Sequence, residues 1–174
     1  KKSWGILAVG SEAKKFYEKF NKNTINFHYS IRINKIVKKR FIKKNVINFL
    51  YIGQFIERKN VINLLTAFKS IKEKNIKLTL IGEGSLKSEM SILSLDDKRI
   101  NILNFKNEKV LKQYYNSADV FILPSKYDGW GVVIMEAMAN KCAIIVTKSS
   151  GVSKEFIKEN YNGKRYQSNL NLRQ

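Results

Sequence analysis

The stretch "DVFILPSKYDGWGVVIMEAMANKCAIIVT" (Asp119–Thr147) contains the pattern from which the fold class follows. It begins with the apolar run 119–125 and ends with the apolar run 142–147, and neither run alternates with polar residues. Such runs are typical of strands buried on both faces of a parallel sheet. The segment between them is apolar at most positions and follows a Gly-Trp-Gly turn, which predicts a helix over 132–139. Strand, helix and strand in this order predict a right-handed crossover between parallel strands.

The same alternation continues on both sides of this stretch. Further strands are predicted at 48–55, 76–84 and 99–105, and helices at 61–74, 85–95, 108–118 and 153–159. The predicted fold class is therefore α/β, with a Rossmann-like, doubly wound parallel sheet. Ligands of such sheets bind at the carboxyl ends of the strands. In this sequence those ends carry Gly53, Gly82, Asn104, Phe105 and Ser125.

The first 45 residues follow a different pattern. "WGILAV" and "INFHYSI" have the composition of strands, and "SEAKKFYEKFN" between them predicts a helix with Phe16, Tyr17 and Phe20 facing inward. The following "KIVKKRFIKK" (35–44) is a basic connector. Taken alone, this portion is too short for a domain, and we interpret it as the tail of a further domain or as an extension packed on the main one.

The charge balance favours an anionic partner. Lysine and arginine total 33 against 14 aspartate and glutamate residues, for a formal net charge of +19 and a pI near 10.0. Nucleic acid, an anionic membrane surface or a phosphate-bearing ligand would all suit this excess. A codon bias toward lysine, with the lysines on solvated faces, explains it equally well.

The scarcity of cysteine and histidine excludes two classes of site. The single cysteine, Cys142, rules out a disulfide framework and indicates a reducing compartment. One histidine, His28, leaves no His/Cys cluster for a metal. Because no apolar run approaches the roughly 20 residues of a membrane span, we expect a cytoplasmic protein, either free or peripheral at the inner face of the membrane.

Two carboxylates flank the mouth of the predicted helix over 132–139. Asp128 precedes the helix in a glycine-flanked loop, and Glu136 lies five residues beyond Gly131, about 7.5 Å along the helix axis. The amide N–H groups of Gly131, Val132 and Val133 have no partner within the helix and favour an anion such as a diphosphate. A nucleotide bound there would place its ribose near Glu136 and its attached group near Asp128. The alternative is an ordinary turn aspartate and a solvated glutamate.

The loop after the first strand of the sheet carries Arg58 and Lys59. Both cations are near enough to the predicted ligand edge to contact the same phosphates, and an arginine fork suits phosphate well. Two solvated loop cations are the alternative.

Four segments occur in the order of a known signature. They are "YIGQFIERKNVINLLTAF", "LTLIGEGSLKSEM", "YYNSADVFILPS" and "PSKYDGWGVVIMEAMANKCAIIVTKSSGVSKEFI". Over about 46–163 the chain resembles the C-terminal, nucleotide-sugar-binding half of the family 4 retaining glycosyltransferases, which have the two-domain GT-B fold. The acidic pair of the family's Glu-x7-Glu motif corresponds to Asp128 and Glu136.

The resemblance implies transfer of a sugar from a UDP- or GDP-linked donor to an acceptor, with retention at the anomeric carbon. It implies that the catalytic-site carboxylates are Asp128, which would contact the donor sugar, and Glu136, which would bind the ribose. It further implies that Lys59 binds phosphate, that Asn104 and Phe105 hold the base, and that no metal or other cofactor takes part. The donor's sugar and diphosphate would lie against the backbone of Gly129, Trp130, Gly131 and Val132.

The sequence departs from the family pattern at several positions. Gln54 replaces a common arginine after the first strand, a role that Arg58 is placed to fill, and Asn60 replaces a common glycine. Of a usual glycine pair only Gly151 is kept. Residues 1–45 are interpreted as a remnant of the N-terminal, acceptor-binding domain plus the interdomain linker. Residues 46–174 are then the C-terminal domain, truncated before a closing helix that we expect beyond Asn171.

The resemblance leads to one function with two alternatives. The expected function is the donor-binding part of a transferase that acts on a glycan or lipid-linked acceptor in surface polysaccharide biosynthesis, at an anionic membrane surface. The first alternative is a donor-binding subunit or fragment that is inactive without a separate N-terminal domain. The alternative from another class, a charge-driven nucleic-acid-binding module, is disfavoured because aromatic platforms are sparse beside the basic segment.

Overall fold

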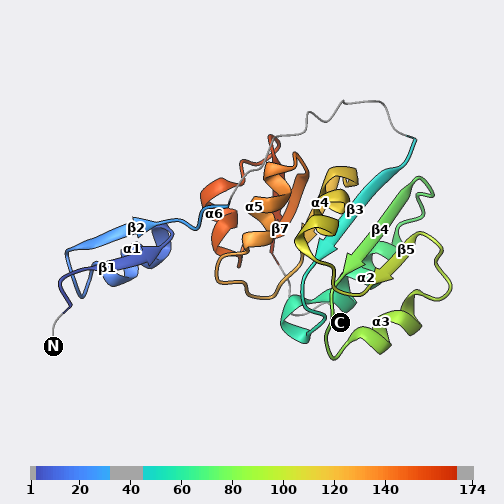
Figure 1. Cartoon of the computed structure of the whole chain (residues 1–174), viewed down its shortest axis with the longest axis horizontal. Coiled ribbons are helices and arrows are strands. Elements are labelled where there is room, and N and C mark those ends of the chain that lie inside the picture. The colour runs from blue at the N-terminus through green and yellow to red at the C-terminus, as the bar shows by residue number, and fades with distance from the viewer. Residues whose placement is uncertain (1–2, 32–44, 168–174) are drawn as a thin grey trace.

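A six-stranded parallel sheet forms the main body of the protein in the computed structural model, which describes residues 3–31 and 45–167. Its strands lie in the order β5-β4-β3-β6-β7-β8, and every neighbouring pair is parallel (Figure 1). The strands are β3 (Ile47–Ile52), β4 (Ile76–Ile81), β5 (Ile100–Leu103), β6 (Val120–Leu123), β7 (Ala143–Thr147) and β8 (Gly163–Tyr166). The predicted fold class is confirmed.

Helices connect the strands in sequence order. They are η1 (Glu57–Lys59, a 3-10 turn), α2 (Val61–Ser70), α3 (Lys87–Ser94), α4 (Glu108–Ser117), α5 (Val132–Ala139) and α6 (Gly151–Phe156). Because crossovers are right-handed, α2 and α3 cover one face of the sheet and α4, α5 and α6 the other. From β3 the chain proceeds outward to β4 and β5, then returns to the other side of β3 as β6. The strand order therefore reverses between β3 and β6, which makes this gap the topological switch point.

The core lies between the sheet and its helices. The apolar strand runs place Leu50, Leu78, Phe121 and Ile144 in the fully buried interior. Helix α2 buries Val61, Leu64, Leu65 and Phe68 at the spacing of one helix face. Burial of each such side chain stabilises the fold by about 1.5–3 kcal/mol, so the sheet holds its strand ends in place as a rigid platform for the site.

The strand β8 was not predicted. Its sequence, Gly-Lys-Arg-Tyr, has no apolar run because it lies at the edge of the sheet and contacts only β7. A Cβ on Gly163 would lie 2.3 Å from the carbonyl oxygen of Ile144, so glycine lets the two strands approach. Helix α6 also begins two residues before its predicted start, at Gly151.

The N-terminal segment forms a small unit of its own. Strands β1 (Ile6–Val9) and β2 (Thr24–Phe27) pair in parallel, with α1 (Ser11–Tyr17) between them, and Figure 1 shows this unit at one end of the molecule beside α6. The inward orientation predicted for three aromatic residues is wrong: Phe16, Tyr17 and Phe20 are 55%, 42% and 73% exposed. Two strands and one helix offer too little apolar area to cover them. The domain division at residue 45 stays a prediction, and the basic connector 35–44 lies outside the described residues.

Candidate functional site

An ion pair between Lys59 and Asp128 occupies the switch point. Lys59 ends η1, which follows β3, and Asp128 lies in the loop after β6. The Lys59 Nζ is 2.5 Å from Asp128 Oδ2, and these side chains are only 13% and 12% exposed. The hydroxyl of Ser125 donates to the same carboxylate oxygen at 3.3 Å. The structure thus brings together three predicted site residues from two adjoining loops.

Hydrogen bonds to backbone carbonyl groups also join the two loops. The Arg58 guanidinium donates to the carbonyl of Tyr127 at 2.9 Å, and the Lys126 amide donates to the carbonyl of Arg58 at 2.9 Å. The Asn60 side-chain amide donates to the carbonyl of Pro124 at 3.2 Å. Asn60 has the left-handed conformation, with φ 58°, which asparagine adopts more readily than most residues. This explains why it can stand where glycine is common.

The Gly-Trp-Gly turn forms the mouth of α5. Gly131 caps the helix with φ 85°, a conformation that favours glycine. Within the described ranges, no group accepts a hydrogen bond from the amides of Val132 or Val133. No atom lies within 4 Å of the position that a Cβ on Gly129 would take. The helix mouth therefore has free donors beside an open approach, as anion binding requires.

Helix α6 supports this turn from behind. The amide of Val152 donates to the Trp130 carbonyl at 3.0 Å, and the Ser150 hydroxyl donates to the same oxygen at 3.2 Å. A Cβ on Gly151 would lie 2.3 Å from the carbonyl oxygen of Gly129. The one glycine kept from the family pair is thus the one that this close approach requires.

The side chain of Trp130 is turned toward the N-terminal unit. It is 6% exposed, stacks on His28 with ring centroids 5.4 Å apart, and meets Phe156 edge-on. Its indole N–H points to the sulfur of Met135 at 3.3 Å. The ring is thus packed against protein side chains, and the predicted contact between the Trp130 backbone and the donor stays a prediction.

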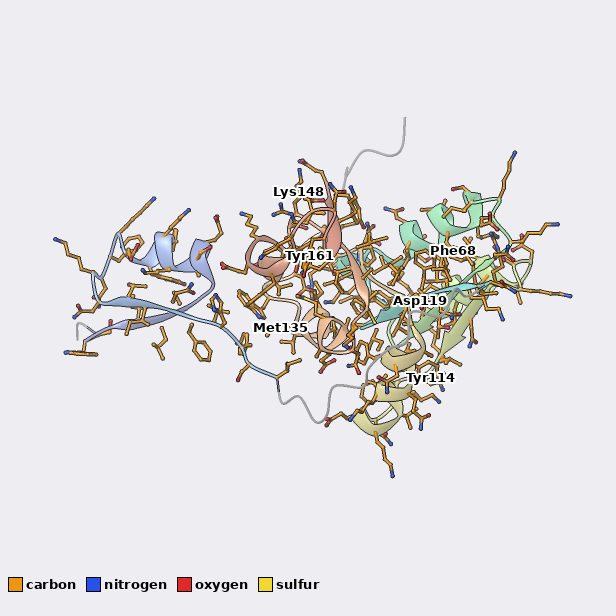
Figure 2. The ribbon with its side chains drawn as sticks, turned by 90° about the horizontal axis from the view of Figure 1, so that it is seen from above. Phe68, Tyr114, Asp119, Met135, Lys148 and Tyr161 are labelled. Atoms are coloured by element: carbon orange, nitrogen blue, oxygen red, sulfur yellow. The ribbon has the colours of Figure 1, made fainter. Side chains whose placement is uncertain are left out.

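Glu136 has a partner that sequence reasoning missed. The hydroxyl of buried Tyr115, on α4, donates to Glu136 Oε2 at 2.7 Å. Burial, and then the neighbouring carboxylate, raise the pKa of the Tyr115 hydroxyl far above its usual range, so it stays protonated. Figure 2 labels the adjacent residues Tyr114 and Met135, which mark the two helices that carry this contact.

The remaining predicted residues line the neighbouring strand ends. A Cβ on Gly82 would lie 1.9 Å from the Gly53 carbonyl oxygen, so only glycine allows the close backbone approach just after β3 and β4. Lys87 joins the next end by donating to Asn104 Oδ1 at 2.5 Å and to Glu83 at 3.0 Å. The hydrogen bond from Lys87 to Glu83 is the main cause of the lowered pKa of the Glu83 carboxyl.

Phe105 follows β5 with 68% of its surface exposed. Its side chain is therefore open to solvent at the same carboxyl edge of the sheet as Asn104. The predicted roles of these residues toward a base stay predictions.

A pocket of about 390 Å³ lies where the N-terminal unit meets the main body. The N-terminal unit contributes Val9, Gly10, Glu12 and Ala13 to it. The main body contributes residues 127–130, 148–151, 154 and 155, which include Asp128 and Gly129. An N-terminal wall for the site was not predicted, because residues this far apart in sequence carry no shared local pattern.

The described part of the chain has neither a metal-binding cluster nor a helix that could span a membrane. Among residues 3–31 and 45–167, no three His, Cys, Asp or Glu side chains are grouped to hold a metal ion. The expectation of a metal-independent site stays a prediction. None of the helices in this part of the chain is long and apolar enough to cross a membrane.

Known proteins resemble this chain in sequence and in fold. An uncharacterized glycosyltransferase of Methanocaldococcus jannaschii, MJ1607, is 34% identical over 90 residues, which cover 50% of this chain and 23% of that protein. The lipopolysaccharide outer core galactosyltransferase WaaB superposes with a TM-score of 0.81 at 20% identity, over 94% of this chain and 48% of WaaB. Anabaena Alr3699/HepE in complex with UDP superposes with a TM-score of 0.77 at 17% identity, over 94% of this chain and 50% of that protein.

These alignments define the fold and its extent. The parallel sheet with helices on both faces is that of one half of a GT-B glycosyltransferase. The chain spans less than a quarter of the curated relative's length and about half of each solved structure. Residues 32–171, most of the chain, match the sequence model of the family described as glycosyl transferases group 1. The chain therefore belongs to the glycosyl transferases group 1 family.

Proposed function

We propose that this chain binds the nucleotide-sugar donor of a retaining glycosyltransferase that acts in surface polysaccharide biosynthesis. The observation that carries the proposal is the open mouth of α5 at the switch point, flanked by Asp128 and Glu136. A helix N-terminus with free amides binds a diphosphate. Carboxylates on either side accept hydrogen bonds from the hydroxyl groups of the sugar and of the ribose.

The proposed chemistry divides among named groups. As the bond between the sugar and the diphosphate breaks, negative charge grows on the leaving diphosphate. The amides of Val132 and Val133 stabilise this charge from fixed positions, and Lys59 with Arg58 adds cationic charge. Asp128 holds the donor sugar and Glu136 the ribose, so the anomeric carbon faces the acceptor. The proposal uses no metal ion.

The nature of the donor and acceptor rests on the relatives. HepE binds UDP in its solved structure, and WaaB acts in building the lipopolysaccharide outer core. By analogy we assign a UDP- or GDP-linked donor and a glycan or lipid-linked acceptor. The net charge of +19 would hold the protein at an anionic cytoplasmic membrane surface. Transfer requires an acceptor-binding domain, in the same polypeptide or as a separate subunit.

Calorimetric titration with UDP and GDP tests the proposal. Glu136→Ala should weaken binding of the preferred nucleotide roughly 10- to 100-fold, the value of a lost hydrogen bond to a charged group. Glu89→Ala is the matched control, since Glu89 is an exposed glutamate on α3. If the folded wild-type chain binds neither nucleotide at millimolar concentration, the proposal is wrong.

The same variants separate the nucleic-acid alternative. Charge-driven binding of an oligonucleotide falls steeply as salt is raised. It would also be indifferent to Glu136→Ala, because that change removes no positive charge. Oligonucleotide binding with that signature, together with no effect of UDP or GDP, would favour the alternative.

A further inference from the structure

The contact between Tyr115 and Glu136 joins two crossover helices. Tyr115 is 4% exposed and lies near the end of α4, whereas Glu136 lies 21 positions later on α5. The tyrosine is itself held firmly. Its ring packs against Phe121 of β6 with centroids 5.8 Å apart, and its carbonyl accepts a hydrogen bond from the thiol of Cys142 at 3.4 Å.

We propose that Tyr115 is a positioning residue, which holds the Glu136 carboxylate in the orientation that receives the ribose of the donor nucleotide. The inference rests on the proposed function, because it assigns Glu136 to the ribose. It adds a residue from outside the ligand edge of the sheet. Tyr115 would act only through Glu136 and would not touch the nucleotide.

The direction of the hydrogen bond supports this role. An ionised carboxylate can only accept, so the hydroxyl of Tyr115 must be the donor. The bond takes one acceptor site on Oε2 and leaves Oε1, which accepts no hydrogen bond from any residue in the described ranges. A carboxylate has about four lone-pair sites, so sites remain for both vicinal hydroxyls of a ribose.

The energetic reason is pre-organisation. A free glutamate on a helix samples several rotamers, and a ligand that needs one of them must bear the cost of ordering it. Tyr115 restricts this freedom before the nucleotide arrives. Without the hydroxyl, we expect nucleotide affinity to fall about 2- to 10-fold, the range for immobilising one flexible side chain. The loss should concentrate on the ribose hydroxyls.

The test compares ribonucleotides with 2′-deoxyribonucleotides. Wild type, Tyr115→Phe and Tyr114→Phe are each titrated with UDP, 2′-deoxy-UDP, GDP and 2′-deoxy-GDP. Tyr114 is the matched control because it adjoins Tyr115 on α4 and its hydroxyl bonds to no described residue. The readout is the ratio of the two dissociation constants for the same base. A merely structural role would not change this ratio, since both ligands need the same folded protein.

We expect wild type and Tyr114→Phe to prefer the ribonucleotide by the same factor, and Tyr115→Phe to lose most of that preference. An unchanged ratio in Tyr115→Phe would overturn the inference and leave the proposed function standing. Failure of wild type to bind any of the four nucleotides would instead overturn the proposed function. Should Tyr115→Phe unfold at 25 °C, the titrations are run cold in sucrose, which favours the compact state.

Discussion

The ammonium of Lys59 lies 2.5 Å from the carboxylate of Asp128. The sequence alone had suggested only that Lys59 contacts a phosphate and Asp128 a sugar. The pair closes the switch point of the sheet, where both side chains are largely buried. A charge in such a place is stable only while its partner is present. The pair therefore joins the two loops of the candidate site.

The first prediction concerns this pair. Lys59→Met should lower the free energy of unfolding by about 3 kcal/mol, because it leaves the Asp128 charge buried and unpaired. The double variant Lys59→Met/Asp128→Leu should recover most of that loss, since no charge is then buried. Urea denaturation monitored by circular dichroism measures both.

The control is the exposed ion pair between Lys126 and Glu57, which joins the same two loops. Lys126→Met should cost less than about 1 kcal/mol, because solvent screens an exposed pair. Equal losses for Lys59→Met and Lys126→Met would contradict the importance assigned to burial.

The second prediction separates two glycines of the site. Gly151→Ala places a Cβ 2.3 Å from the backbone of Gly129, so the turn must shift, at a cost of about 1–3 kcal/mol in stability. Gly129→Ala meets nothing within 4 Å and should change stability by less than about 0.5 kcal/mol. It should nevertheless weaken UDP or GDP binding, because the methyl group fills the approach to the helix mouth. Thermal unfolding measures the stability of both variants and calorimetry measures nucleotide binding. Unchanged binding by Gly129→Ala would refute the prediction.

The third prediction is that the contact between the N-terminal unit and α6 weakens at acid pH. Glu155 accepts a hydrogen bond from the amide of Ser11 at 2.5 Å. Hydrogen bonding by Ser11, by its side chain first and then by its amide, lowers the pKa of the Glu155 carboxyl, and the nearby His28 lowers it further. A lowered pKa contributes stability that is complete above the unfolded value of about 4.3. That contribution is lost as the pH falls through the folded value. Below about pH 4 we expect the N-terminal unit to loosen from the main body.

Trp130 reports this loosening, because it is buried against His28. In a Trp4→Phe background it is the sole tryptophan, since the chain has two. Its emission should shift to longer wavelength below about pH 4. Glu155→Gln should remove that acid step. An identical acid step in both proteins would show that another group controls the contact.

Much of the fold could be predicted from local patterns. The apolar runs of β3, β4, β6 and β7 and the helices between them were found because burial on both faces, or on one helix face, leaves a periodic signal. The edge strand β8 was missed because an edge needs no such run. The predicted burial of Phe16, Tyr17 and Phe20 was wrong, because burial of a helix face requires enough neighbouring structure to cover it.

The site divides in the same way. The helix mouth at Gly131, with a carboxylate on each side, was visible from spacing alone. The tertiary structure alone decided that Lys59 would meet Asp128, that Trp130 would turn to His28, and that Tyr115 would hold Glu136.

The reason is physical. Backbone periodicity and hydrophobic spacing are local properties, which any short segment displays before the chain folds. A polar contact between residues 21 or 69 positions apart depends on the order and register of strands that bring two loops or two helices together. This sequence by itself determined a doubly wound sheet with a glycine-rich helix mouth, and the folded arrangement decided which side chains meet there.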